Sequence, residues 1–189
     1  MKVVNLLLNR IKYLSLIIIF SLLSCSKAEL ETVYTKQEKS IDAFITKTLE
    51  ANPDYLVKRN NGSNRIIIKD GQGRKVLKKG QKIKFYYAAY VFSGSISANN
   101  LFSTNHKETA EAAKWEVSNH NLIAETLVLN EDKFTEGLLN GLEGVKAGEI
   151  CYIIFSGKYG FGAKPLASIP KNSALAYQIW VEEINNIEE

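Results

Sequence analysis

The sequence predicts an α+β domain in which short helices accompany a β-sheet. Two apolar runs, Ile150–Phe155 and residues 175–184, are too short and too rich in β-branched and aromatic residues to form helices of ordinary length. Residues 81–92 give the longest strand pattern, in which Tyr87 shares one face with the residues two places before and after it. Residues 41–49 instead carry apolar side chains at helical spacing, which predicts one amphipathic helix ahead of the sheet.

Turn residues and shorter patterns predict the remaining elements. The Asn-Gly pair within residues 60–63 predicts a turn, and the two glycines within residues 70–73 predict a hairpin connection. Between and after them we expect a strand at residues 65–69, a helix at residues 107–116 and a strand at residues 127–129.

The first 24 residues have the composition of a signal peptide. Three basic residues and no acid precede or flank an apolar run at residues 14–23. As a helix this run would rise only about 15 Å, which is too short to span a bilayer. The segment Leu22-Leu23-Ser24-Cys25 resembles a bacterial lipobox and predicts acylation of Cys25. The alternative is an ordinary cleaved leader with a chance cysteine.

The resemblance to bacterial lipoproteins implies a location in the cell envelope. No aspartate follows Cys25 directly, which by that resemblance favours the outer membrane, with the protein facing the periplasm. Residues 26–34 are expected to form a polar tether between the lipid and the folded part. The predicted division is therefore a signal peptide at 1–24, a tether and helix at 25–62 and a domain at 63–189.

Charge and cysteine content exclude several classes of protein. Loss of the three basic leader residues from the 24 in the chain leaves 21 against 20 acidic residues, and no basic stripe with interleaved aromatics appears. Nucleic-acid binding is therefore not expected. Cys151 lies alone inside a strand pattern, so we expect a buried structural thiol and no intramolecular disulfide.

The N-terminal helix has defined ends in the sequence. Thr35 and Glu38 have the spacing of a capping box, and Asn52-Pro53 stops the pattern, which predicts a helix over residues 36–51. Its apolar face can dock on its own domain, which we favour because the helix is short, or it can form a homodimer through the same residues.

The stretch from residue 137 to residue 183 carries the most specific motifs. Gly144-x-Lys146-x-Gly148-Glu149 precedes a strand, Tyr159-Gly160-Phe161-Gly162 follows it, and Ile169-Pro170-x-Asn172 leads into the last strand. In this order the motifs resemble the FKBP-type peptidyl-prolyl isomerases over about residues 64–183. The resemblance implies a curved antiparallel sheet wrapped around a short helix that begins near Thr135.

The same resemblance implies a pocket for the proline ring of a polypeptide. The backbone N–H of Thr135 would anchor the peptide, and the other positions would form the walls and floor; equally, the aromatic ones could be ordinary core, above all Tyr177. The positions that match are Tyr87, Phe102, Ser103, Phe134, Thr135, Leu138, Phe161, Ile169 and Tyr177.

Three of these positions depart from the family pattern. Leu138 stands where the family usually has a tryptophan floor, and Ser103 replaces an aspartate. Phe161 replaces a tyrosine and loses a hydroxyl donor, worth about 0.5–1.5 kcal/mol as one net hydrogen bond. We therefore expect polypeptide binding to persist better than turnover.

A region between the pocket positions is longer than in a minimal family member. Residues 103–133 place 31 residues between Phe102 and Phe134, too few for an independent domain. His106 and His120 both lie there without accompanying ligand spacing, so we expect surface loop residues and no metal site.

The function implied by the resemblance is isomerisation of X-Pro bonds in exported, proline-containing unfolded polypeptides. This reaction breaks no covalent bond, so it requires neither cofactor nor metal, only an apolar cavity that fits the twisted amide. The alternatives are an FKBP-like chaperone that binds polypeptide without useful catalysis, and a structural envelope lipoprotein with an occluded pocket.

Overall fold

The structure is a computed structural model that describes residues 2–115, 122–130, 134–164, 166 and 168–185, with side chains from residue 27 onward. The chain divides into two compact units, residues 1–36 and residues 37–189, and each is described by itself. The second unit holds all the strands and the candidate site.

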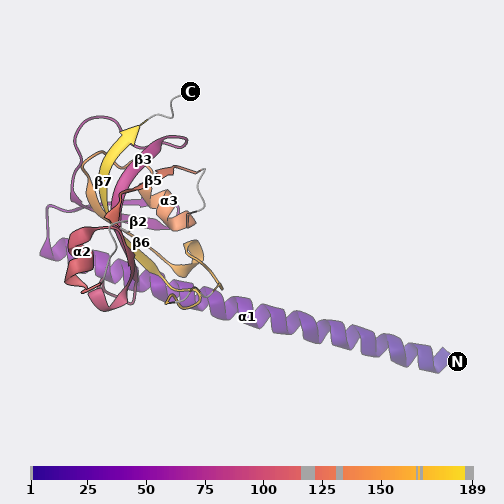
Figure 1. Cartoon of the computed structure of the whole chain (residues 1–189). Helices are drawn as coiled ribbons and strands as arrows, with labels where there is room; N and C mark the ends of the chain where they lie inside the picture. The colour runs from indigo at the N-terminus through magenta and orange to yellow at the C-terminus, as the bar shows by residue number, and fades with distance from the viewer. Residues whose placement is uncertain (1, 116–121, 131–133, 165, 167, 186–189) are drawn as a thin grey trace. The chain divides into compact units, whose positions relative to one another are not determined.

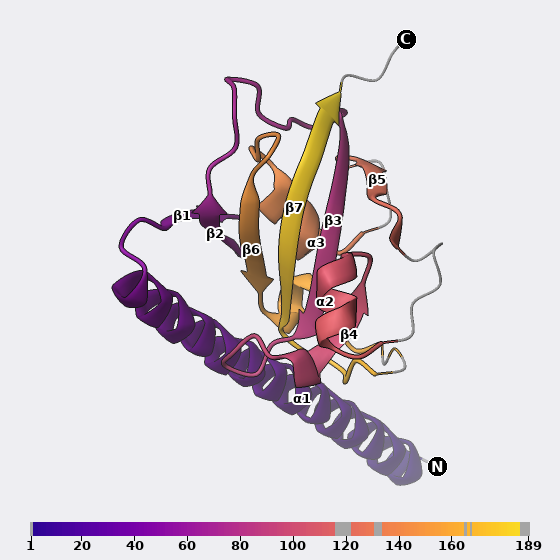
Figure 2. The same ribbon diagram turned by 60° about the vertical axis from the view of Figure 1, so that its left-hand side comes forward.

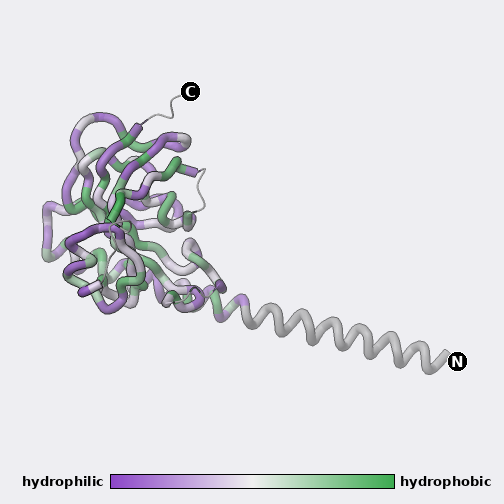
Figure 3. Tube along the Cα trace, viewed as in Figure 1, coloured by the Kyte–Doolittle hydropathy of each residue, from purple (hydrophilic) through white to green (hydrophobic). Residues whose placement is uncertain are grey.

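In the described part of the second unit, seven strands form one antiparallel sheet (Figures 1 and 2). The strand order is β1-β2-β6-β7-β3-β4, and β5 also pairs with β3 beyond the end of β4. Figure 3 shows that the central strand β6 is strongly apolar, as expected for a strand paired on both sides. The strands are β1 (Leu56–Asn60), β2 (Ser63–Lys69), β3 (Lys82–Val91), β4 (Leu101–Thr104), β5 (Glu125–Val128), β6 (Ile150–Phe155) and β7 (Leu175–Asn185).

Each face of the sheet has its own apolar cluster, because successive side chains of a strand point to opposite faces. Phe85 and Ala89 of β3 pack with helix α3 (Glu136–Leu142) on one face. Ala88 and Tyr90 belong to the cluster on the other face, which also contains residues of helix α1 (Lys2–Ala51). The α+β fold class and the alternation predicted for β3 are confirmed.

The last part of α1 docks on its own domain, as favoured from the sequence. Ile41 and Ile45 are buried in the cluster opposite α3, and Phe44 meets Phe92 edge-to-face with ring centroids 5.4 Å apart. The Gln37 side chain donates to the carbonyl of Asn172 at 2.7 Å and accepts from the N–H of Gly157 at 2.8 Å. This face of residues 37–51 is therefore occupied within the chain.

Residues 26–34, predicted as a polar tether, are helical, and the helix start predicted at Thr35 is wrong. Helix α1 runs without interruption to Ala51, and Thr32 and Thr35 donate their side-chain hydroxyls to the carbonyls four residues earlier, at 2.9 and 2.8 Å. No glycine or proline interrupts this region, so nothing in it stops a helix. Within the described residues, no helix is long and apolar enough to cross a membrane.

Helix α3 lies unusually close to β6 because two of its residues lack a side chain. A Cβ on Gly137 would lie 2.2 Å from the Phe155 ring, and one on Gly141 would lie 2.2 Å from Ile153. These two glycines serve close packing, whereas Gly144 has φ +79° and supplies the reversal after the helix.

A buried arginine holds the C-terminal end of α3. Arg65 of β2 donates to the carbonyls of Gly141 and Glu143, both at 2.9 Å, and to that of Gly144 at 3.1 Å. Its Nε lies 3.3 Å from the Glu149 carboxylate, and both side chains are almost fully buried. Arg65 therefore satisfies carbonyls that a helix end leaves without partners.

Several predicted boundaries need correction. Strands β1 and β4 were not predicted, and the sheet begins at Leu56, ahead of the predicted domain start at residue 63. No hairpin forms at residues 70–73, because β2 pairs with β1 and β6 and the chain continues to β3. Helix α2 (Lys107–Ala112) ends four residues before the predicted end of its helix.

Candidate functional site

A cavity of about 280 Å³ opens between α3 and the sheet. Eight of the nine predicted pocket residues line it. Phe85 and Ala89 also line it and were not predicted, although they share the strand face of Tyr87 and alternation could have found them. The lining residues are Phe85, Tyr87, Ala89, Phe102, Ser103, Phe134, Thr135, Leu138, Phe161 and Tyr177.

The ninth predicted residue, Ile169, does not line the cavity. It is 7% exposed and packs in the same apolar cluster. Reciprocal backbone hydrogen bonds with Leu166, of 2.6 and 3.2 Å, form a tight turn that leaves Leu166 exposed and Ile169 inside. Ile169 therefore supports the cavity from the core.

The lining residues come from strands β3, β4 and β7, from α3 with the two residues before it, and from the loop that holds Phe161. Strands β3 and β4 pair antiparallel with Ala89 opposite Ser103, and β7 places Tyr177 opposite Ala89 on the other side. Thr135 is the residue before α3, and Leu138 lies in its first turn and is 1% exposed. Phe134 is 36% exposed and forms part of the rim, while Phe161 comes from the loop after the short helix Gly157–Tyr159.

Aromatic rings meet at the centre of the cavity wall. The Tyr177 ring lies edge-on to Phe102 with a centroid distance of 6.4 Å, and stacks on Phe155 at 5.9 Å. Tyr87 approaches the same ring at 6.4 Å. These contacts fix the positions of the rings, so the cavity is preformed.

The serine that replaces the family's aspartate still serves Tyr87. The hydroxyls of Tyr87 and Ser103 lie 2.9 Å apart and share a hydrogen bond. Thr104 Oγ1 donates to the Tyr87 carbonyl at 2.7 Å, and Asn105 Oδ1 accepts from the Tyr87 N–H at 2.6 Å. The substitution at residue 103 therefore removes a charge from the cavity and keeps a polar contact.

A second pair of hydroxyls, from Tyr177 and Thr135, lies in the same wall. Burial raises the pKa of Tyr177 well above its ordinary value, the neighbouring Tyr87 raises it further, and the Thr135 side chain opposes the rise. Tyr177 therefore stays protonated at physiological pH. Thr135 Oγ1 is buried without a well-formed hydrogen bond to any described residue, and it does not cap α3, so its contact with Tyr177 is a loose one.

Two further predictions concern the thiol and the insertion. Cys151 is fully buried, and burial raises its pKa well above the ordinary value, which confirms a structural thiol. Of the insertion at 103–133, Ser103 is the one described residue that lines the cavity. Residues 116–121 and 131–133, and with them His120, lie outside the described residues.

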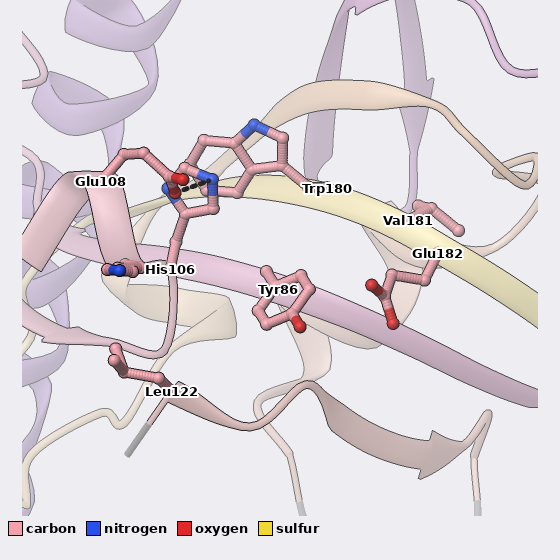
Figure 4. Close-up of a pocket in the computed structure, with 8 residues that line it drawn as sticks. Tyr86, His106, Glu108, Leu122, Trp180, Val181 and Glu182 are labelled. Carbon is pink, nitrogen blue, oxygen red and sulfur yellow. Dashed lines mark ion pairs between the residues drawn. The ribbon is translucent and has the colours of Figure 1, made fainter. Parts of the chain in front are cut away.

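His106 is not the surface loop residue that the sequence predicted. Figure 4 shows its ring lying against the indole of Trp180. The two rings stack with centroids 3.7 Å apart, and they border a second cavity of about 460 Å³, larger than the one beside α3. The Nε2 of His106 lies 3.1 Å from Glu108, and burial lowers the pKa of His106. Tyr86 and Trp180, which pair across β3 and β7, also line this cavity, and none of the predicted pocket residues does.

Comparison with known proteins agrees with the fold. Three solved structures are similar: the three FKBP domains of wheat FKBP73 (16% identity, TM-score 0.55), the N-terminal domain of FKBP42 from Arabidopsis thaliana (20%, 0.53) and FkpA from Escherichia coli (15%, 0.55). They cover 70%, 70% and 86% of this chain. The chain spans 51% of the wheat structure, 94% of the Arabidopsis domain and 65% of FkpA.

A search of the curated proteins gave no match. The family model described as FKBP-type peptidyl-prolyl cis-trans isomerase matches residues 73–182, which is more than half of the chain and includes every residue that lines the cavity. The chain belongs to the FKBP-type peptidyl-prolyl cis-trans isomerase family.

Proposed function

We propose that this protein is an active peptidyl-prolyl isomerase that assists the folding of exported polypeptides. The observation that carries the proposal is the aromatic-walled cavity of about 280 Å³, lined by eight of the positions that match the family's proline pocket. A proline ring in this cavity would rest on the buried side chain of Leu138, between Phe102 and Tyr177.

Such a cavity can lower the barrier without a nucleophile. The barrier to rotation, about 18–20 kcal/mol, comes from loss of amide resonance. The planar amide is stabilised by charge separation, which an apolar, water-poor cavity disfavours relative to the twisted form. The backbone N–H of Thr135, at the entry to α3, would anchor the peptide while the X-Pro bond turns.

Direct measurement of isomerisation tests this proposal. A protease-free assay on short X-Pro peptides should show acceleration by the purified domain, with a preference for an apolar residue before proline because Phe134 and Phe161 flank the cavity. A protein that fails to accelerate the reaction, yet prevents aggregation of an unfolded client, would be a polypeptide-binding chaperone and would refute the enzymatic proposal.

We further propose that the protein is anchored in the cell envelope by a lipid on Cys25. The support is the lipobox-like Leu22-Leu23-Ser24-Cys25 at the end of an apolar run. Such an anchor would place the isomerase where exported polypeptides fold. Cys25→Ala should abolish incorporation of labelled fatty acid and release the protein from membranes, with Cys151→Ala as the matched control. Unchanged labelling and membrane retention of the Cys25 variant would refute the proposal.

A further inference from the structure

The cavity beside α3 contains two pairs of neighbouring hydroxyls, and one pair forms a well-made hydrogen bond while the other does not. Tyr87 and Ser103 lie 2.9 Å apart and share a well-formed hydrogen bond. Thr135 Oγ1, in contrast, is buried and lacks a well-formed partner among the described residues, although Tyr177 lies beside it. A buried hydroxyl without a partner is unfavourable, so this wall is suited to a polar group brought by a ligand.

The sequence context makes the missing hydrogen bond more notable. Thr135 occupies the N-cap position of α3, where a threonine hydroxyl usually accepts a hydrogen bond from the helix backbone. Here it makes no such bond. Both Thr135 and Tyr177 line the cavity, but the Thr135 hydroxyl itself is buried, so Tyr177 is the member of this pair that can offer its hydroxyl to a ligand.

The chemistry of a prolyl peptide limits what that polar group can be. Proline has no N–H, so an X-Pro segment presents only carbonyl oxygens close to the ring, and these are acceptors. A protonated tyrosine hydroxyl is a donor to such an oxygen. When the ring is held against the cavity wall, the carbonyl of the residue before proline is the group that moves relative to it during rotation.

We propose that Tyr177 is a substrate-binding residue whose hydroxyl, in loose contact with Thr135, donates a hydrogen bond to the carbonyl oxygen of the residue before proline. The inference deepens the proposed isomerase function and rests on it. It assigns to Tyr177 the donor role that Phe161 has lost, because Phe161 lines the same cavity without a hydroxyl. The lost hydroxyl at residue 161 is then replaced by another hydroxyl of the same cavity.

Removal of the Tyr177 hydroxyl provides the first part of the test. Tyr177→Phe keeps the ring that stacks on Phe155, so the fold should be retained. We expect kcat/KM on an X-Pro peptide to fall about three- to tenfold, the effect of one net hydrogen bond. Tyr90→Phe is the matched control, because Tyr90 is equally buried but lies in the cluster on the other face of the sheet.

A substrate change provides the second part. In a thioxo peptide, sulfur replaces the carbonyl oxygen of the residue before proline and is a much weaker acceptor. If Tyr177 donates to that atom, wild type and Tyr177→Phe should differ by less than twofold on the thioxo peptide. The variant Phe161→Tyr should restore activity to Tyr177→Phe while changing the wild type little, because it offers a replacement donor in the same cavity.

The outcomes separate this inference from the proposed function. An equal loss on both substrates, or no loss on either, would overturn the role of Tyr177 while leaving an active isomerase. If the wild type neither isomerises nor binds the peptide, both proposals fail. If it binds without isomerising, the isomerase proposal fails and the protein is a binding module; an unchanged peptide affinity of Tyr177→Phe would then overturn the role of Tyr177 as well.

Discussion

The two faces of the sheet carry similar apolar residues, but the cavities beside them differ in their lining. On one face, the glycines of α3 allow the helix backbone to reach β6, yet a cavity remains where Thr135 and Leu138 meet β3 and β4. On the other face, Ile41 and Ile45 of α1 fill the region over β3 and β6. The face opposite α3 also borders a cavity, at His106 and Trp180, but that cavity is lined by charged groups, whereas the one beside α3 is walled by aromatic rings.

Removal of Arg65 should have the largest effect, because it breaks the connection between the sheet and the end of α3. Arg65→Ala leaves the buried Glu149 carboxylate and three helix-end carbonyls without their partner. We expect a loss of about 3–5 kcal/mol in the free energy of unfolding, measured by urea denaturation. Arg59→Ala is the control, since its ion pair with Asp42 is exposed and should matter by at most about 1 kcal/mol. Equal losses for the two variants would contradict this account.

A methyl group on α3 tests whether close packing defines its face. Gly141→Ala would place a Cβ 2.2 Å from Ile153, so the helix must move away from β6. We expect a destabilisation of about 1–3 kcal/mol in thermal unfolding and a weaker affinity for X-Pro peptides, because Leu138 would move with the helix. Gly73→Ala is a contrasting variant, because its added Cβ would meet no atom within 4 Å and its φ of +82° would be the source of any loss, so peptide affinity should stay unchanged. Normal peptide affinity in Gly141→Ala would contradict coupling between this packing and the cavity.

Opening the cavity should affect binding more than stability. Phe102→Ala removes the ring that stands edge-on to Tyr177 and admits water. We expect kcat/KM to fall about tenfold, equivalent to about 1.4 kcal/mol, with a smaller change in unfolding. Phe92→Ala, which removes the ring that contacts Phe44 on the opposite face, should destabilise the domain without changing kcat/KM of the folded fraction. The reverse pattern would contradict the assignment of the cavity to this face.

The smallest expected effect is on the pH dependence of stability, and it concerns His106 on the face away from α3. Burial lowers the pKa of His106, so the folded protein resists its protonation more than the unfolded chain does. The uncharged, partly buried His106 therefore contributes its full stabilisation above the pKa of the unfolded chain, about 6.5. This contribution is lost as the pH falls below that value. His106→Gln should flatten the dependence of unfolding free energy on pH between 7 and 5, while isomerase activity at pH 7 stays unchanged. A steeper dependence in the variant would contradict this sign.

The sequence predicted the elements with strong local signals and missed those set by distant partners. The strand at Ile150–Phe155 follows from residue type alone, and it was predicted correctly. Strands β1 and β4 are short, and β4 depends on pairing with β3, so neither has a clear signal of its own. The capping box at Thr35 failed because the residues before it also favour a helix.

The candidate site shows the same limit. Family motifs located the cavity-lining residues, whereas Ile169 was placed in the lining although a tight turn carries it into the core. The hydrogen bond between Tyr87 and Ser103 could not be predicted, because it depends on the register of two strands. The loose contact of Thr135 with Tyr177 depends in turn on how α3 meets β7.

Pairing of β2 with β6 has a consequence for any shortened form of this protein. The family match begins at residue 73, so a chain cut there would lack β1, β2 and the docked end of α1. Strand β6 would then become an edge, exposing the backbone groups of an Ile-rich segment that can recruit a strand from another molecule. We expect such a fragment to self-associate, so residues 37–72 would protect the sheet of the whole chain from edge-to-edge aggregation.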